Sequence, residues 1–268
     1  MLDGMSGPEK SAAVDDVLTI CAISVAACML TTMLHEGLGH AAVAILTLHA
    51  SGTLTTVAWS SVSGSRWVFA AGTLVNLATA LIFRLLLQQA RKAWASLRFF
   101  LWVTMAFSLF AGTGYFFYSG VTDFGDWAAV IGGLHPHWIW RMGLIVVGAA
   151  SYYFSIRIVG ANLVRFMGVS LDDLLRFRRL TVLPYVSALL IDGFAGLLNP
   201  FGLKYVLLSA LAATAGANCA LLWLRHYIPK NVVPELRGDA LSRSYVWIVA
   251  AAVLAVVYIV ILGPGIRL

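Results

Sequence analysis

The stretch that decides the fold is VLTICAISVAACMLTTMLHEGLGHAAVAILT, residues 17–47. The run is apolar and longer than the roughly 20 residues that a helix needs to cross a bilayer. Its second half nevertheless carries His35, Glu36 and His40, whose side chains are costly to bury in lipid. Ionisable groups at membrane depth usually serve a function, so the run predicts a membrane helix that contains a site.

The composition of the whole chain indicates the same environment. Of its 268 residues, 60% are hydrophobic and 11% are charged, whereas soluble domains carry roughly 25% charged residues. All three cysteines lie in apolar runs, which is typical of small buried side chains and predicts no disulfide framework. The net charge of +6 comes from basic residues in short loops, without a basic stripe, so nucleic-acid binding is not expected.

Hydropathy predicts an all-α polytopic membrane protein with about six or seven transmembrane helices and a short β-hairpin after the first. The expected spans are residues 17–47, 66–90, 98–119, 138–160, 182–198, 203–224 and 244–263. With the N-terminus in the cytoplasm, 14 of the 18 basic residues lie at cytoplasmic ends; those outside are Arg66, Arg141, Lys204 and Arg267. Because cytoplasmic loops are enriched in Lys and Arg, we expect this orientation, in the plasma membrane.

The chain divides into three parts by these patterns. Residues 1–16 are expected to form a cytoplasmic tail, 17–133 a membrane core that holds the site, and 134–268 additional transmembrane helices. Within the core, residues 49–65 are rich in Thr, Ser and Val and predict a hairpin packed on protein or near the interface. Residues 164–181 predict a basic amphipathic segment on the cytoplasmic headgroups.

The polar residues of the first run follow the pattern H-E-x-x-x-H, one residue longer than the H-E-x-x-H zinc motif. Five helical steps would place the imidazoles of His35 and His40 about 140° apart, too far to face one metal. A π-bulge realigns such a pair, and Gly37 and Gly39 tolerate the distortion. The sequence therefore predicts a widened helix here, with a zinc ion and Glu36 as a carboxylate base beside it.

A catalytic zinc needs a third protein ligand, and two aspartates are placed to supply it. Asp123 and Asp126 follow the third expected span and so lie on the outer side, where the outward half of the first run also lies. Asn76 lies at similar depth in the second span. Asp123 has an alternative role as a helix cap, because it precedes an apolar helix-like run.

The order of these features resembles the site-2 protease family of intramembrane zinc metalloproteases. H-E-G-L-G-H on a membrane helix is followed by a Thr/Ser/Val-rich hairpin. A-G-T-L-V-N-L-A-T-A follows on the next span, and an aspartate-glycine segment comes after the third. The resemblance covers roughly residues 20–130, and no later span has a counterpart in the family.

The resemblance implies a role for each matching residue. His35 and His40 would bind Zn²⁺, and Glu36 would be the general base for hydrolysis of a peptide bond in a membrane-embedded protein. Asn76 would hold the substrate backbone or its oxyanion. Asp126 is the first choice for the third ligand, and Asp123 is the second.

The sequence departs from the family in three places, which leave other functions open. The histidine spacing is one residue longer, Thr73 stands where the family has proline, and the proline-rich approach to the aspartate is missing. Asp192, in Leu190-Ile191-Asp192-Gly193, also resembles the family's aspartate segment but lies too far along the chain, so it ranks third as a ligand. A non-proteolytic or inactive relative, acting as a transporter-like or structural membrane protein, is the alternative.

Overall fold

Most of the chain is helical in the computed structural model, which describes residues 14–203, 207, 214–236 and 238–268. Within these residues, five helical stretches are long and apolar enough to cross a membrane: Val17–Leu48, Arg66–Lys92, Ala95–Thr122, His137–Met167 and Tyr245–Leu262. Each coincides with a span expected from hydropathy. The described part of the expected tail is only residues 14–16, and residues 1–13 lie outside the described chain.

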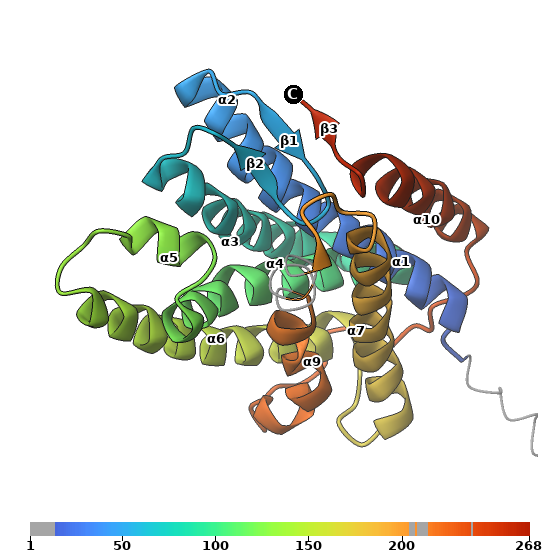
Figure 1. The fold of residues 1–268 in the computed structure, drawn as a ribbon. Coiled ribbons are helices and arrows are strands. Elements are labelled where there is room, and N and C mark those ends of the chain that lie inside the picture. Colours follow the sequence, from blue (N-terminus) through green and yellow to red (C-terminus); the bar gives the residue numbers. More distant parts are fainter. Residues whose placement is uncertain (1–13, 204–206, 208–213, 237) are drawn as a thin grey trace, which may run out of the picture.

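The elements follow one another in a simple order, which Figure 1 shows as a bundle with a small sheet at one end. The long helices are α3 (Arg66–Gln89), α4 (Ala95–Thr122), α6 (His137–Met167) and α7 (Leu174–Gly196). The first run consists of α1 (Val17–Met33), η1 (Leu34–Ala41) and α2 (Ala42–Leu48). The remaining elements are η2 (Ala90–Lys92), α5 (Asp126–Ile131), α9 (Ala220–Trp223), η4 (Leu224–Tyr227), α10 (Tyr245–Val257), η5 (Tyr258–Leu262), β1 (Gly52–Leu54), β2 (Trp59–Ser61) and β3 (Ile266–Arg267).

Two of the seven expected spans differ from the helices that can cross a membrane. The span expected at 182–198 belongs to α7, which begins at Leu174; the arginines of its first turns and Asp192 lower its hydropathy, and it is not among the five. The span expected at 203–224 includes residues outside the described chain, and its described end is the short helix α9.

The amphipathic segment expected at 164–181 is not a separate element. Its first residues end α6 at Met167, and its last residues form the first turns of α7. Phe177 and Leu180 are buried in the core, whereas Leu174 and Leu175 of the same segment are exposed. The expected position of this segment on the cytoplasmic headgroups stays a prediction.

The hairpin expected within 49–65 is present. β1 and β2 pair antiparallel, with Gly52 opposite Ser61 and Leu54 opposite Trp59. The C-terminal strand β3 adds to the other edge of β1, where Thr53 lies opposite Arg267, so that β1 is the central strand. Figure 1 shows β3 reaching β1 from the end of α10. The sheet thus joins the first and the last helical stretches of the chain.

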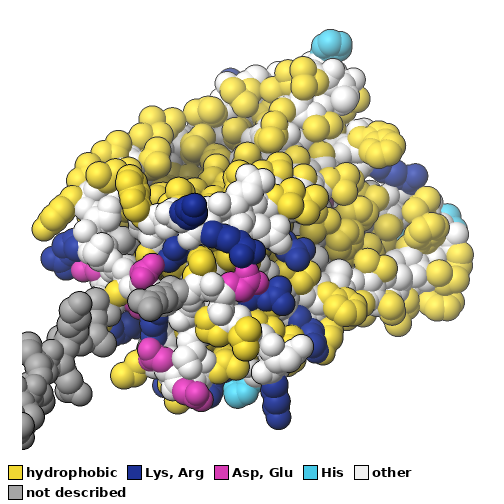
Figure 2. All heavy atoms as spheres, turned by 180° about the vertical axis from the view of Figure 1, so that it is seen from behind, with side chains coloured by type: hydrophobic (Ala, Val, Ile, Leu, Met, Phe, Trp, Pro, Cys, Tyr) yellow, Lys and Arg dark blue, Asp and Glu magenta, His cyan; other side chains and the backbone are white. Residues whose placement is uncertain are grey.

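The surface separates apolar from charged side chains. Figure 2 shows hydrophobic side chains over most of one face, with Lys, Arg, Asp and Glu gathered in its lower part. Large exposed apolar side chains occur on α6 and α10, among them Val146, Phe154, Val249 and Val253. Ion pairs link the residues just before α1 to later segments of the chain; they include Arg176–Asp15 and Arg243–Asp16.

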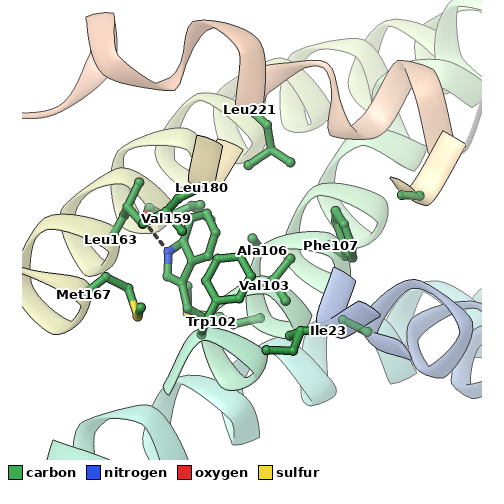
Figure 3. Close-up of a cluster of buried hydrophobic side chains, with 14 of the residues drawn as sticks. Ile23, Trp102, Val103, Ala106, Phe107, Val159, Leu163, Met167, Leu180 and Leu221 are labelled. Carbon is green, nitrogen blue, oxygen red and sulfur yellow. Dashed lines mark hydrogen bonds between the residues drawn. The ribbon is translucent and has the colours of Figure 1, made fainter. Parts of the chain in front are cut away.

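Helix α4 is the centre of the bundle and packs on α1, α3 and α6. Trp102 is fully buried, and its indole N–H donates to the Val159 carbonyl of α6 at 3.0 Å. Figure 3 shows this ring surrounded by apolar side chains of several helices, including Ile23, Leu163 and Leu180. A buried indole that finds a hydrogen-bond partner contributes its full apolar area to the core. This core fixes α1, which continues into η1 with His35, Glu36 and His40, and α3, which carries Asn76.

Candidate metal centre

The first run changes its helical form where its histidines lie. α1 ends at Met33, and Leu34–Ala41 form the π-helix η1 before α2 begins at Ala42. The Ala42 N–H donates to the carbonyl of Gly37, five residues earlier, which is the π-helical pattern. This confirms the local widening that the H-E-x-x-x-H spacing predicted.

The widened turn brings both imidazoles to one point. His35 Nε2 and His40 Nε2 lie 3.1 Å apart, and Asp126 Oδ2 lies 3.2 Å from the first and 3.1 Å from the second. Ligand atoms bound at zinc's usual bond lengths in a tetrahedral site lie about 3.3 Å from one another. Two imidazole nitrogens and one carboxylate oxygen with these separations could hold such an ion, and their chemistry suits zinc.

Close backbone packing between η1 and α3 allows this arrangement. A Cβ on Gly72 would lie 2.5 Å from His40 Nε2 and 2.7 Å from His35 Nε2. A Cβ on Gly39 would lie 2.5 Å from the Gly72 Cα. Both distances are too short for any side chain, so glycine at both positions lets the two imidazoles lie against α3.

The second nitrogen of each imidazole has a partner on α3. His40 Nδ1 lies 2.7 Å from the Val68 carbonyl, so it carries a proton and leaves Nε2 free to bind a metal. His35 Nδ1 lies 3.0 Å from Asn76 Nδ2, while Asn76 Oδ1 is buried without a partner. Turning this amide around would let Oδ1 accept from an Nδ1–H, as a metal-bound His35 requires. The unpaired Oδ1 is therefore consistent with a site in which His35 binds a metal through Nε2 and donates its Nδ1–H to Asn76.

Glu36 is held beside the imidazoles by the hairpin. The backbone N–H of Trp59 in β2 donates to Glu36 Oε2 at 2.8 Å. Its other oxygen, Oε1, lies 4.0 Å from His35 Nε2. The ligand atoms of His35, Glu36 and His40 all lie within 4.8 Å of one another. The carboxylate is thus fixed at one oxygen and directed toward the candidate ligands with the other.

Asp126 reaches the site from α5, the short helix that follows α4. Burial acts to raise the pKa of this carboxyl, but the His40 ring and the hydrogen bonds that Asp126 shares with both imidazoles outweigh burial and hold the pKa well below its usual range in the metal-free site. Trp127, the next residue, donates its indole N–H to Thr73 Oγ1 at 3.0 Å. Thr73, which stands where the site-2 protease family has proline, therefore anchors α5 to α3.

The other two candidates for the third ligand lie elsewhere. Asp123 has a left-handed conformation, φ 54°, at the end of α4, and its oxygens lie 3.0 and 3.1 Å from His137 Nε2. Arg141 lies 3.7 Å from the same carboxylate. Asp192 is bound by the hydroxyl of Tyr258 and by other side chains without an imidazole. Among the three aspartates, Asp126 is the one that contacts both imidazoles.

Sequence reasoning missed several groups that complete the centre. The Val68 carbonyl and the Trp59 N–H are backbone atoms, which no residue pattern reveals. Tyr115 of α4 also borders the site, with its ring centroid 5.6 Å from that of His35. One signal did exist for Gly72, which belongs to the same A-G-T-L-V-N segment as Asn76.

No protein-family model, curated protein or solved structure matches this chain. The interpretation of the centre therefore rests on the geometry described above.

Proposed function

We propose that this chain is an intramembrane zinc metalloprotease of the site-2 protease kind. The observation that carries the proposal is the meeting of two imidazole nitrogens and the Asp126 carboxylate within 3.2 Å of one another, beside Glu36. Two nitrogens and one oxygen are a donor set of catalytic zinc sites, which keep one position open. A buried carboxylate next to that set is the other part that hydrolysis requires.

In this proposal each side chain has one task. His35, His40 and Asp126 would hold the zinc, which would lower the pKa of a bound water and polarise the substrate carbonyl. Glu36 Oε1 faces the imidazoles and would take a proton from the attacking water, then pass it to the leaving amine. The Trp59 N–H keeps the other Glu36 oxygen in place during both transfers.

The substrate in this proposal is a membrane-embedded protein. Five helices long and apolar enough to cross a bilayer, with exposed apolar side chains on α6 and α10, support insertion of the chain into a membrane. The distribution of Lys and Arg supports a cytoplasmic N-terminus, and the proposal places the chain in the plasma membrane. The centre would then lie toward the extracytoplasmic face, because it occupies the end of the first run opposite to the N-terminus of α1.

Metal analysis of the purified protein tests the proposal. We expect about one zinc per chain in detergent, with loss of that zinc on His35→Ala. His49→Ala is the matched control, because His49 is an exposed histidine at the end of α2 and should leave the zinc content unchanged. Absence of stoichiometric zinc from the wild-type protein would contradict the metalloenzyme and favour a transporter-like or structural role.

Activity is tested separately from metal binding. Glu36→Gln should retain zinc and lose the cleavage of a transmembrane test peptide in proteoliposomes by roughly 100-fold or more, the contribution of a general base. A variant that retains both zinc and cleavage would exclude Glu36 as the base.

A further inference from the structure

A second buried carboxylate lies in the bundle and has no task in the proposed reaction. Asp192 of α7 is 4% exposed. The hydroxyl of Tyr258 donates to its Oδ1 at 2.8 Å, and Thr214 Oγ1 and Cys28 Sγ donate to its Oδ2. Within the described chain, no Lys, Arg or His forms an ion pair with Asp192. Burial of an unpaired carboxylate in an apolar bundle costs free energy, and ionisable groups at membrane depth are usually functional.

A polar cavity connects this carboxylate with the candidate metal centre. Its volume is about 60 Å³, and one water needs about 10–15 Å³. His35, Glu36 and Asp192 all line it, together with Thr31 and Thr32 of α1. The cavity therefore has room for several waters and reaches both carboxylates.

The walls of the cavity contain polar atoms that lack a partner. Thr56 Oγ1 and Asn218 Oδ1 are both buried without a hydrogen bond, and both residues line the cavity. The Asn76 amide also faces it and has one end unpaired whichever way it is turned. Buried polar atoms in folded proteins are nearly always satisfied, and ordered water is the usual partner where the protein offers none.

Irregular helix geometry occurs at two places beside the cavity. The π-helix η1 supplies His35 and Glu36. Near Asp192, its hydrogen-bond partner Tyr258 is the first residue of the π-helix η5, and the cavity residue Thr214 lies in π-helical geometry at 214–216. π-helical turns are rare and occur frequently at functional sites, so their presence near both carboxylates indicates that the two carboxylates work together.

We infer that this cavity is a water-binding chamber that Asp192 anchors and that holds ordered water next to Glu36. The inference rests on the proposed function, in which water is the second substrate and must be present inside an apolar bundle. Asp192, Thr56 and Asn218 each supply a side-chain oxygen in the cavity that can accept a hydrogen bond from water. A polar cavity of this size holds water, whereas an apolar one stays dry.

Hydroxyl-radical labelling by X-ray radiolysis of the detergent-solubilised full chain tests the chamber, because radicals form from water at the site. The reporters are Cys28, which lines the cavity, and Tyr258, which lies next to it; they are 4% and 2% exposed, and both donate hydrogen bonds to Asp192. Trp102 and Met105 are the controls, both reactive side chains at 0% exposure in the apolar core. We expect oxidation of both reporters and protection of both controls, read by mass spectrometry. Equal protection of all four residues would overturn the inference.

Matched variants locate the water. Thr56→Val removes an unpaired hydroxyl from the cavity, and Thr104→Val removes an unpaired buried hydroxyl that does not line it. We expect reduced labelling of Cys28 and Tyr258 with Thr56→Val and with Asp192→Leu, and unchanged labelling with Thr104→Val. Unchanged labelling in all three variants would also overturn the chamber.

The zinc content of the same samples separates the two proposals. Labelled reporters in a protein without zinc would leave the chamber standing and contradict the protease. Protected reporters in a protein with zinc would contradict the chamber and leave the protease standing.

Discussion

Two aspartates, the half-buried Asp126 and the buried Asp192, have similar sequence settings and different surroundings. Each adjoins a glycine and lies near apolar residues, and each is a possible third ligand on sequence grounds. Asp126 Oδ2 lies 3.2 and 3.1 Å from two imidazole nitrogens. Asp192 instead accepts hydrogen bonds from the hydroxyls of Tyr258 and Thr214 and from the thiol of Cys28.

The difference shows that the partners of a buried carboxylate decide its chemistry. Imidazole nitrogens have lone pairs that can bind a cation together with the carboxylate, so Asp126 belongs to a donor set. Hydroxyl and thiol hydrogens satisfy a carboxylate directly, and a thiol that keeps its proton is not a metal ligand. Asp192 is therefore suited to anchor water in a polar cavity, and Asp126 is suited to bind metal.

Replacing each of these aspartates by alanine should give the largest difference in zinc affinity between two variants. Asp126→Ala removes one of three ligands, and we expect zinc affinity to fall by more than the roughly 10–100-fold typical of an outer-shell partner. Asp192→Ala should leave zinc affinity within the error of the wild type. Competition with a fluorescent chelator measures both values. An equal loss in the two variants would remove the distinction drawn above.

A single methyl group on the backbone of α3 should have the next largest effect. Gly72→Ala places a Cβ 2.5 Å from His40 Nε2, so an imidazole or the helix must move and zinc affinity should fall at least roughly tenfold. Gly143→Ala is the control, because a Cβ there meets nothing within 4 Å and alanine favours the α6 helix. The control should retain zinc and show an unchanged or raised Tm. Zinc retention by Gly72→Ala would exclude the packing account of the site.

Part of this centre could be predicted from the sequence. The five-residue spacing of His35 and His40, with glycines between them, predicted the π-helix, because only a widened turn lets both imidazoles face one point. The hairpin was predictable from its composition, and Asp126 was the preferred aspartate.

The remaining features depend on contacts that the sequence does not encode locally. β3 is two residues long and is a strand only because β1 offers an edge. α7 begins at Leu174, before the span expected at 182–198, and the burial of Phe177 and Leu180 in its first turns depends on how the helices pack. The depth of Asn76 placed it near the site, but the contact of its amide with His35 was not predicted.

The amide of Asn76 on α3 should contribute to zinc affinity less than the ligand Asp126, and its replacement is the third test. Asn76→Leu leaves His35 Nδ1 without its partner, and zinc affinity should fall by roughly 10–100-fold, the usual cost of losing an outer-shell partner. Asn76→Asp keeps an acceptor oxygen for the Nδ1 proton and should retain most of the affinity. The same chelator competition measures both. Full zinc affinity in Asn76→Leu would leave the amide free for the substrate role that the family resemblance implies.

The smallest effect should come from the contact that holds α5 in place. Asp192 lies within a helix of 23 residues, but Asp126 begins a helix of only 6, so its position depends on anchors. Thr73→Val removes the acceptor of the Trp127 indole bond. Loss of a hydrogen bond of about 0.5–1.5 kcal/mol should weaken zinc binding roughly two- to tenfold without changing the site's ligands. Thr79→Val, buried in the same helix but outside the site, is the control. If Thr73→Val and Thr79→Val bind zinc equally, packing alone holds α5 in place. Asp126 and Asp192 would then differ in their hydrogen-bond partners but not in how firmly their helices are held.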